Sequence, residues 1–301
     1  MTPHYVNSPT PTITSSSVEE TPTLDSRLGP LAWRSSGQGP TLVFFAGALA
    51  NGDLWRDVIL ALQDRYRCIT IDLPLGAHTR PLSSGADRSA NSLARLLLDC
   101  LELLDLEDAT VIANDTAGGL LLLSLATDHP GLARIGRLVL TNCESYEKFP
   151  PKPLRPASAL SRRFPPLVRG LLRLQLRSSL GRRRAVSTVL ASGLDDDREN
   201  SFFGPAQRDR RVADDLVAAM AGFRPQLLIE AAQAIPRFKR PVLLIWGDAC
   251  EFFPIADAER LASEFPNAAL IPIPKAKTWI PIDNPTAVAD SIVTHVPARV
   301  R

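Results

Sequence analysis

Short apolar runs alternate with helix-length segments along most of the chain, and this alternation is the strongest constraint on its fold. Runs such as "TLVFFAG" and "RCITIDLP" have the length and composition of strands that are buried on both faces. Parallel strands need long crossovers, which the intervening helices supply. The order therefore predicts an α/β protein with a mostly parallel sheet flanked by helices. The predicted strands are 41–47, 67–74, 109–114, 135–142, 241–247 and 269–274; the predicted helices are 51–66, 89–105, 116–128, one starting at 255, and 285–296.

One long segment interrupts this alternation. Residues 150–235 open with "PPKPLRP" and are then typical of helices, with no obvious strand. Because two predicted strands follow the segment, an insertion into one sheet fits better than two independent domains. We therefore expect one α/β core of residues 25–149 and 236–301, with residues 150–235 as a helical lid over the strand ends.

Composition excludes several classes of protein. A net charge of +2 over 301 residues favours no particular partner, and nucleic-acid binding is not expected. Four scattered cysteines without metal-ligand spacing predict neither a metal site nor a disulfide framework, and no cofactor is expected. There is no apolar stretch long enough for a transmembrane segment and no secretory signal, so we expect a cytoplasmic protein. Residues 1–24, rich in Pro, Ser and Thr, are expected to form a mobile tail.

The stretch "VIANDTAGGL" (111–120) has the outline of a nucleophile elbow, which is a strand that enters a tight turn and then a helix. Asp115 stands at the turn. Such a turn needs small residues on both sides, and Ala113 and Ala117 occupy those positions. The start of the following helix favours a negative charge there. The alternative is that Asp115 only caps that helix.

Three further segments occur in the order of one known superfamily. They are "FFAGALANGDLW" after the first long strand, "DLPLGAHTRP" after the next, and "LLIWGDACEFFP" after the insertion. Over about residues 25–297 the chain resembles the α/β-hydrolase superfamily. It is most similar to the branch with "NDT-small-GG" elbows, which is related to haloalkane dehalogenases and epoxide hydrolases. The resemblance implies Asp115 as the catalytic residue and backbone N–H donors at Ala48 and Thr116 for an oxyanion.

The resemblance also implies a base histidine after the last strand and an acid three residues after the glycine of "WG". Thr278 and Cys250 stand at the matching positions, so two of the three triad positions are expected to be lost. His78 is the one histidine expected to approach the pocket. Glu144, after the strand that follows the elbow helix, and Glu251 are the other substitute polar groups. Asn114, Leu49 and Trp279 complete the candidate pocket, and a solvated or capping role is the simpler alternative for each substitute.

An aspartate nucleophile forms an ester that water, activated by a base, must then hydrolyse. Without the histidine this second half should stall. The chain also lacks a lid tyrosine for epoxide opening, since its tyrosines are Tyr5, Tyr66 and Tyr146. We therefore expect Asp115 to transfer protons in a non-hydrolytic reaction (elimination, cyclisation, isomerisation or decarboxylation) on a small hydrophobic pathway intermediate. A hydrolase or esterase with an unrecognised base, and a binding protein without turnover, remain as alternatives.

The lid carries a separate signal. Between residues 155 and 184 there are nine arginines, interleaved with leucine in "LVRGLLRLQLR". This pattern fits an amphipathic basic helix that contacts an anionic partner, such as an acyl carrier protein or a membrane surface. The alternative is a solvated helix face that the acidic run "DDDRE" (195–199) neutralises.

Overall fold

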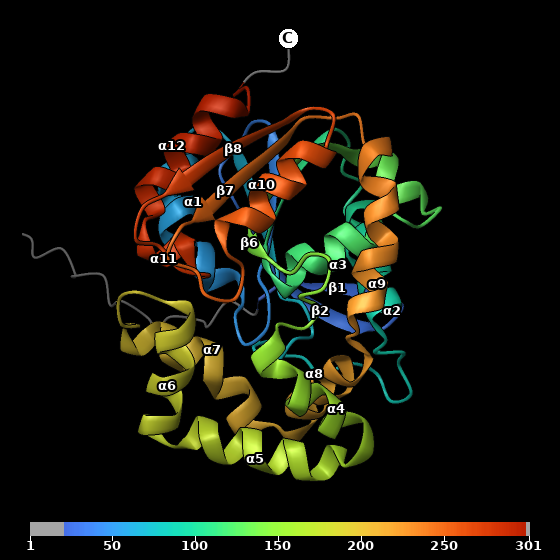
Figure 1. Cartoon of the computed structure of the whole chain (residues 1–301), viewed down its shortest axis with the longest axis vertical. Helices are drawn as coiled ribbons and strands as arrows, with labels where there is room; N and C mark the ends of the chain where they lie inside the picture. The colour runs from blue at the N-terminus through green and yellow to red at the C-terminus, as the bar shows by residue number, and fades with distance from the viewer. Residues whose placement is uncertain (1–20, 299–301) are drawn as a thin grey trace, which may run out of the picture.

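The computed structural model describes residues 21–298, which form one eight-stranded sheet with helices on both faces and a helical layer at one end (Figure 1). The strand order is β1-β2-β4-β3-β5-β6-β7-β8. Pairing is parallel from β4 through β8 and antiparallel for β1 with β2 and for β2 with β4. The strands are β1 (Thr23–Ser26), β2 (Gly29–Ser36), β3 (Thr41–Phe45), β4 (Arg67–Ile71), β5 (Ala109–Asp115), β6 (Ile135–Cys143), β7 (Val242–Gly247) and β8 (Ala268–Ile273).

The six predicted strands are confirmed as β3 to β8. The structure also has the expected α/β-hydrolase fold. The sequence pattern does not predict β1 and β2. The "TLDS" of β1 is too short to show a pattern, and β2 begins with Gly-Pro and ends in polar residues. The sequence predicts a tail over residues 1–24, and residues 1–20 of it lie outside the described residues. Its last two residues, 23 and 24, belong to β1.

Successive residues of the central strands serve opposite faces of the sheet, as the two-residue period of a strand requires. On β3, Val43 and Phe45 pack against the side that carries α2, α3 and α10, whereas Leu42 and Phe44 pack against the side that carries α1 and α12. The core helices and turns are η1 (Gly52–Trp55), α1 (Arg56–Leu62), α2 (Ala90–Leu103), α3 (Thr116–Ser124), η2 (Pro130–Arg134), α10 (Ile255–Glu264), α11 (Ile280–Asp283) and α12 (Pro285–His295).

The inserted segment is helical, and most of it lies beyond the sheet in Figure 1. It comprises η3 (Lys152–Leu154), α4 (Arg155–Arg163), α5 (Pro165–Arg177), α6 (Ser179–Val189), α7 (Asp196–Arg208), α8 (Arg210–Gly222), α9 (Pro225–Ala231) and η4 (Ala232–Arg237). Its last helix, α9, leaves this layer and packs against α3 of the core. None of the helices described here has both the length and the apolar composition needed to cross a membrane.

Candidate active site

Asp115 has the backbone geometry of a strained turn. It is the last residue of β5, with φ 53° and ψ −132°, and α3 begins at the next residue, Thr116. Residues other than glycine rarely adopt a positive φ, and such strain is concentrated at functional sites. The side chain of Asp115 makes no capping hydrogen bond to α3. The turn therefore matches the predicted nucleophile elbow and gives no support to the capping alternative.

Glycines allow neighbouring segments to approach this turn. A Cβ atom added to Gly47 would lie 2.5 Å from Asp115 Oδ2, which is too close for any side chain there. On α3, a Cβ on Gly118 would meet the Cβ of Cys143, and a Cβ on Gly119 would lie 2.8 Å from the Cβ of Glu144. The glycine pair after the elbow thus brings α3 close to the end of β6.

A cavity of about 640 Å³ lies between the carboxyl ends of the strands and the lid. Seven of the predicted site residues line it: Ala48, Leu49, Asp115, Thr116, Glu144, Glu251 and Trp279. Most of the remaining wall is apolar and comes from the lid, with Arg184 as its charged member. No histidine of the described residues lines this cavity.

Asp115 and Glu144 form a pair of carboxyl groups at the sheet end of the cavity. Glu144 directly follows β6, and the Thr116 hydroxyl donates a hydrogen bond of 3.0 Å to its Oε1. Burial raises the pKa of Asp115 to about 7, although the backbone N–H groups of Thr116 and Ala48 lower it in part. Burial, and then the charge of Asp115, raise the pKa of Glu144 well above its usual value. Burial therefore disfavours the charged form of both carboxyl groups, and a charge on one disfavours a charge on the other.

Two buried residues lie close together after β7 and β8, where the resemblance places acid and base. Cys250 Sγ is 3.1 Å from Thr278 Oγ1. Burial raises the pKa of the Cys250 thiol, so this pair stays uncharged at neutral pH. Asn114 attaches the same loop to the elbow: its Nδ2 donates to the backbone carbonyl of Thr278 at 2.7 Å and to Thr141 Oγ1 at 2.9 Å. Neither Asn114 nor Thr278 lines the cavity itself.

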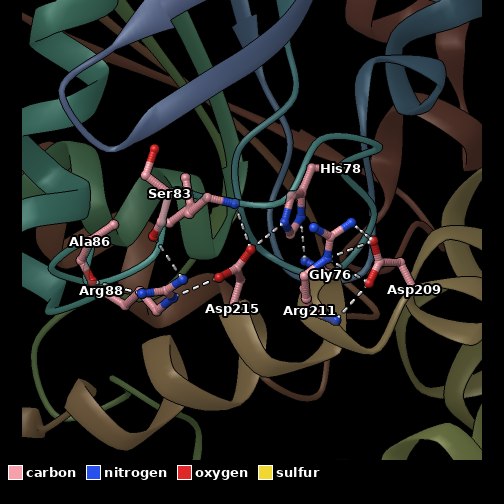
Figure 2. Close-up of polar contacts among 9 residues, drawn as sticks. Gly76, His78, Ser83, Ala86, Arg88, Asp209, Arg211 and Asp215 are labelled. Carbon is pink, nitrogen blue, oxygen red and sulfur yellow. Dashed lines mark hydrogen bonds and ion pairs between the residues drawn. The ribbon is translucent and has the colours of Figure 1, made fainter.

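His78 does not line the cavity, and the expectation that it approaches the pocket is wrong. It lies in the loop after β4, almost fully buried, with Nε2 3.0 Å from Oδ2 of Asp215 on α8 (Figure 2). The backbone N–H of Gly76 donates to His78 Nδ1, so the ring proton is on Nε2 and points at Asp215. The histidine is therefore occupied in holding the lid to the core.

Asp215 collects three hydrogen bonds across this lid–core contact. Besides His78, Arg88 Nε donates at 2.6 Å and the backbone N–H of Leu82 at 3.0 Å (Figure 2). Burial alone would raise the pKa of Asp215, but these hydrogen bonds outweigh it and lower the pKa below its usual value. Asp215 is therefore a buried anion with hydrogen-bond donors around it. The sequence near Asp215 does not indicate these partners, which lie more than 120 residues earlier in the chain.

Two residues that line the cavity carry buried side-chain atoms without a hydrogen-bond partner. Among the described residues, Trp279 Nε1 has no acceptor and Glu144 Oε2 has no partner. Trp279 is 3% exposed and packs edge-on against Phe202, with ring centroids 5.3 Å apart. The sequence pattern identifies Trp279 as a pocket residue but does not show that its indole N–H is free. Buried polar groups without partners are rare, and they mark places where a ligand or water supplies the missing bond.

A mostly parallel sheet, an aspartate on a strained strand–helix turn and an inserted lid define a hydrolase-type α/β fold. The comparisons agree. The alpha/beta hydrolase fold family matches residues 40–285, and the chain belongs to this family. Its relatives include haloalkane dehalogenases: Haloalkane dehalogenase 2 of Mycobacterium tuberculosis is 28% identical over 281 residues, covering 89% of this chain and 92% of that protein.

Two further comparisons broaden this picture. The cis-3-alkyl-4-alkyloxetan-2-one decarboxylase of Xanthomonas campestris pv. campestris is 26% identical over 227 residues, which cover 70% of this chain and 74% of that protein. A crystal structure of an alpha/beta hydrolase fold protein from Burkholderia ambifaria superposes with a TM-score of 0.74 at 20% identity, covering 92% of this chain and 98% of that one. At 20% identity, the likeness to the Burkholderia ambifaria structure shows the fold alone.

Proposed function

We propose that the protein is an enzyme that uses Asp115 as a proton-transferring acid/base in a non-hydrolytic reaction. One observation carries the proposal. Asp115, with its pKa raised to about 7, lies at the cavity near Glu144, whose pKa burial also raises well above its usual value. A group whose pKa is near the working pH is best suited to both take and return a proton. Glu144 supplies a second proton within the same site.

The cavity favours a small hydrophobic substrate with one polar group. Its walls are mostly apolar, so the alkyl part of a substrate gains free energy on leaving water. The free indole N–H of Trp279 is available to a substrate oxygen, and the backbone N–H groups of Ala48 and Thr116 lie beside Asp115. In this proposal Trp279 binds the polar group and Asp115 transfers the proton.

Hydrolysis is the second candidate, because a dehalogenase and esterases are among the proteins that this chain resembles. Against it stand Cys250 and Thr278, an uncharged pair at the positions where the resemblance implies acid and base. A base is needed to activate water against an ester intermediate. The relative named as an oxetanone decarboxylase supports the view that related chains carry out non-hydrolytic chemistry.

The test compares substrates and one isosteric variant. A cis-3,4-dialkyloxetan-2-one would be offered beside p-nitrophenyl esters, haloalkanes and epoxides, with carbon dioxide and alkene, nitrophenol, halide and diol as the measured products. We expect turnover of the oxetanone and poor turnover of the other three. In this reaction Asp115 lends its proton to the ring oxygen as the C–O bond breaks and takes it back as carbon dioxide leaves, so Asp115→Asn should lower that turnover by about 10²–10⁴-fold. The exposed Asp128, changed to Asn, is the matched control and should leave turnover unchanged.

Other outcomes contradict the proposal. Robust ester hydrolysis that survives Asp115→Asn would remove Asp115 from the mechanism. Fast ester or haloalkane turnover that Asp115→Asn abolishes would make the protein a hydrolase. Binding of the oxetanone, seen by calorimetry, with no product from any substrate would favour the binding-protein alternative.

A further inference from the structure

One face of the lid exposes large apolar side chains to solvent. Phe164 and three leucines of α5 follow one another at intervals of three, four and three residues, which places them along one side of the helix. We call these four residues the α5 stripe. Their exposed fractions are 50% for Phe164, 53% for Leu167, 52% for Leu171 and 67% for Leu174. Leu180, at the start of α6, is 56% exposed.

The α5 stripe adjoins the cavity. Val168 and Leu176 of the same helix are buried against the rest of the lid. The helix α5 is therefore apolar both on its buried side and along the exposed α5 stripe. Leu171 belongs to the stripe and also lines the cavity, and Leu154 of η3 likewise lines it while being 40% exposed. The exposed apolar surface is therefore continuous with the wall of the cavity.

Positive charge surrounds this surface. No aspartate or glutamate occurs between Lys148 and Leu194, whereas nine arginines occur there. Arg169 and Arg182 form ion pairs with acidic residues of α8 and α7. The structure shows no carboxylate within ion-pair distance, among the residues it describes, for five exposed arginines: Arg162, Arg163, Arg177, Arg183 and Arg184.

The nearby acidic run does not neutralise these five arginines. Asp195 pairs with Arg56 and Arg198, and Glu199 pairs with Arg182. Only Asp196 and Asp197 of the run have no ion pair among the described residues. The lid face thus keeps a net positive charge beside its apolar stripe.

We infer that the lid docks on an anionic lipid surface, with the α5 stripe inserted among the lipids and the exposed arginines at the headgroups. Helices that lie in a membrane interface combine an apolar face with a basic polar face, as α5 and its neighbours do. An acidic carrier protein would explain the arginines but not four large apolar residues in solvent. Docking in this orientation turns the cavity wall at Leu171 and Leu154 toward the lipid. The inference stands independently of the reaction proposed for Asp115.

Vesicle co-sedimentation tests this docking. The full-length protein is mixed with phosphatidylcholine vesicles, with or without phosphatidylglycerol, and we expect binding only when phosphatidylglycerol is present. Arg163→Gln, Arg177→Gln and Arg183→Gln together should weaken binding about a hundredfold, since each basic residue at an anionic surface contributes about fivefold. Leu167→Gln with Leu174→Gln should weaken it about tenfold or more. Neither residue of this pair lines the cavity.

Matched controls lie outside α4, α5 and α6. Leu60 and Leu103 are 60% and 49% exposed, and changing both to Gln should leave vesicle binding unchanged. The same holds for Gln at the exposed residues Arg65, Arg95 and Arg237. Circular dichroism of each variant checks that the fold is kept.

Several results would overturn the inference. These are no binding of the wild type to anionic vesicles, equal binding to pure phosphatidylcholine, or full binding by either lid variant. Sedimentation velocity could give another result that contradicts the inference. A dimer that the leucine variant dissociates, without vesicle binding, would assign the α5 stripe to a second copy of the chain. Binding of an acidic carrier protein without vesicle binding would assign the arginines to that partner.

Discussion

The Cys250 thiol and the Thr278 hydroxyl face each other at 3.1 Å, one after β7 and the other after β8. The resemblance to the α/β hydrolases implies an acid and a histidine base at these two positions. The two side chains are thus in contact, as an acid and a base at these positions would be. Neither of them is charged near neutral pH. Neither side chain is a base that readily accepts a proton from water near neutral pH.

We expect an acid and a histidine base at these two positions to increase hydrolysis. We expect Cys250→Asp with Thr278→His to raise turnover of a p-nitrophenyl ester or a haloalkane by about 10²–10⁴-fold, the contribution of a general base. Each single variant should gain much less, because an unpaired buried aspartate or an unoriented histidine lacks its partner. Steady-state rates of the three variants at equal protein concentration measure the effect. A folded double variant that is no faster than the wild type would show that the two positions are not those of acid and base.

The raised pKa of Asp115 makes stability depend on pH. Its pKa is about 7 in the folded protein against 3.8 as the ordinary value, so the folded state binds this proton more tightly. The free energy of unfolding should then fall as the pH rises from about 4 to about 7, by up to about 4 kcal/mol. Asp115→Asn is neutral throughout and should lack this loss. Urea unfolding should therefore show the variant as the more stable protein above pH 7 and the two as similar near pH 4.

Asp128→Asn is the control for this series, since Asp128 is exposed and should give a curve parallel to the wild type. Superimposable slopes for the wild type and Asp115→Asn would mean that Asp115 titrates as an ordinary carboxyl group. That outcome would also remove the main support for acid/base chemistry.

The buried contact of Asp215 should contribute far more to stability than an exposed ion pair on the same helix. Asp215→Asn removes a buried anion and leaves Arg88 and His78 without it, which should cost about 3 kcal/mol of unfolding free energy. Asp214, the adjacent residue, pairs with Arg169 and its side chain is 37% exposed. Asp214→Asn should cost less than about 1 kcal/mol. Denaturant titration compares the two, and limited proteolysis should cut the lid faster only in Asp215→Asn.

Two glycines in helices should respond oppositely to alanine. At Gly118 the new Cβ would meet the Cβ of Cys143, so α3 must move away from β6, at a cost of about 1–3 kcal/mol. At Gly170, in the middle of α5, no atom lies within 4 Å of the new Cβ. Alanine there should stabilise the protein by about 0.5–1 kcal/mol through helix propensity. Thermal melts of both variants measure the signs, and a stabilised Gly118→Ala would contradict the close packing of α3 on β6.

The central sheet was predictable because each of its strands is a continuous apolar run, as strands buried on both faces must be. The edge strand β1 was not, since its burial depends on β2 and not on a pattern of its own. The elbow was predictable for a related reason. Small residues around Asp115 are required by the turn itself, so they are visible in a short stretch of sequence.

Contacts between segments far apart in the sequence limit how much of the site could be predicted. His78 and Asp215 are 137 residues apart, and nothing in the loop after β4 indicates that the histidine is already bound by the lid. The free indole N–H of Trp279 likewise depends on which acceptors the fold leaves near it. The bond from Thr116 to Glu144 had a signal, since a hydroxyl residue directly after an elbow aspartate lies beside the end of the next strand.

Asn114 holds the loop after β8 by the main-chain carbonyl of Thr278 and not by its side chain. This bond is available whichever amino acid occupies position 278, because it uses the backbone carbonyl. A change of side chain at position 278 therefore leaves the partner of the Asn114 amide in the loop. The Asn114 amide makes the reaction chemistry of such a chain evolvable separately from its architecture.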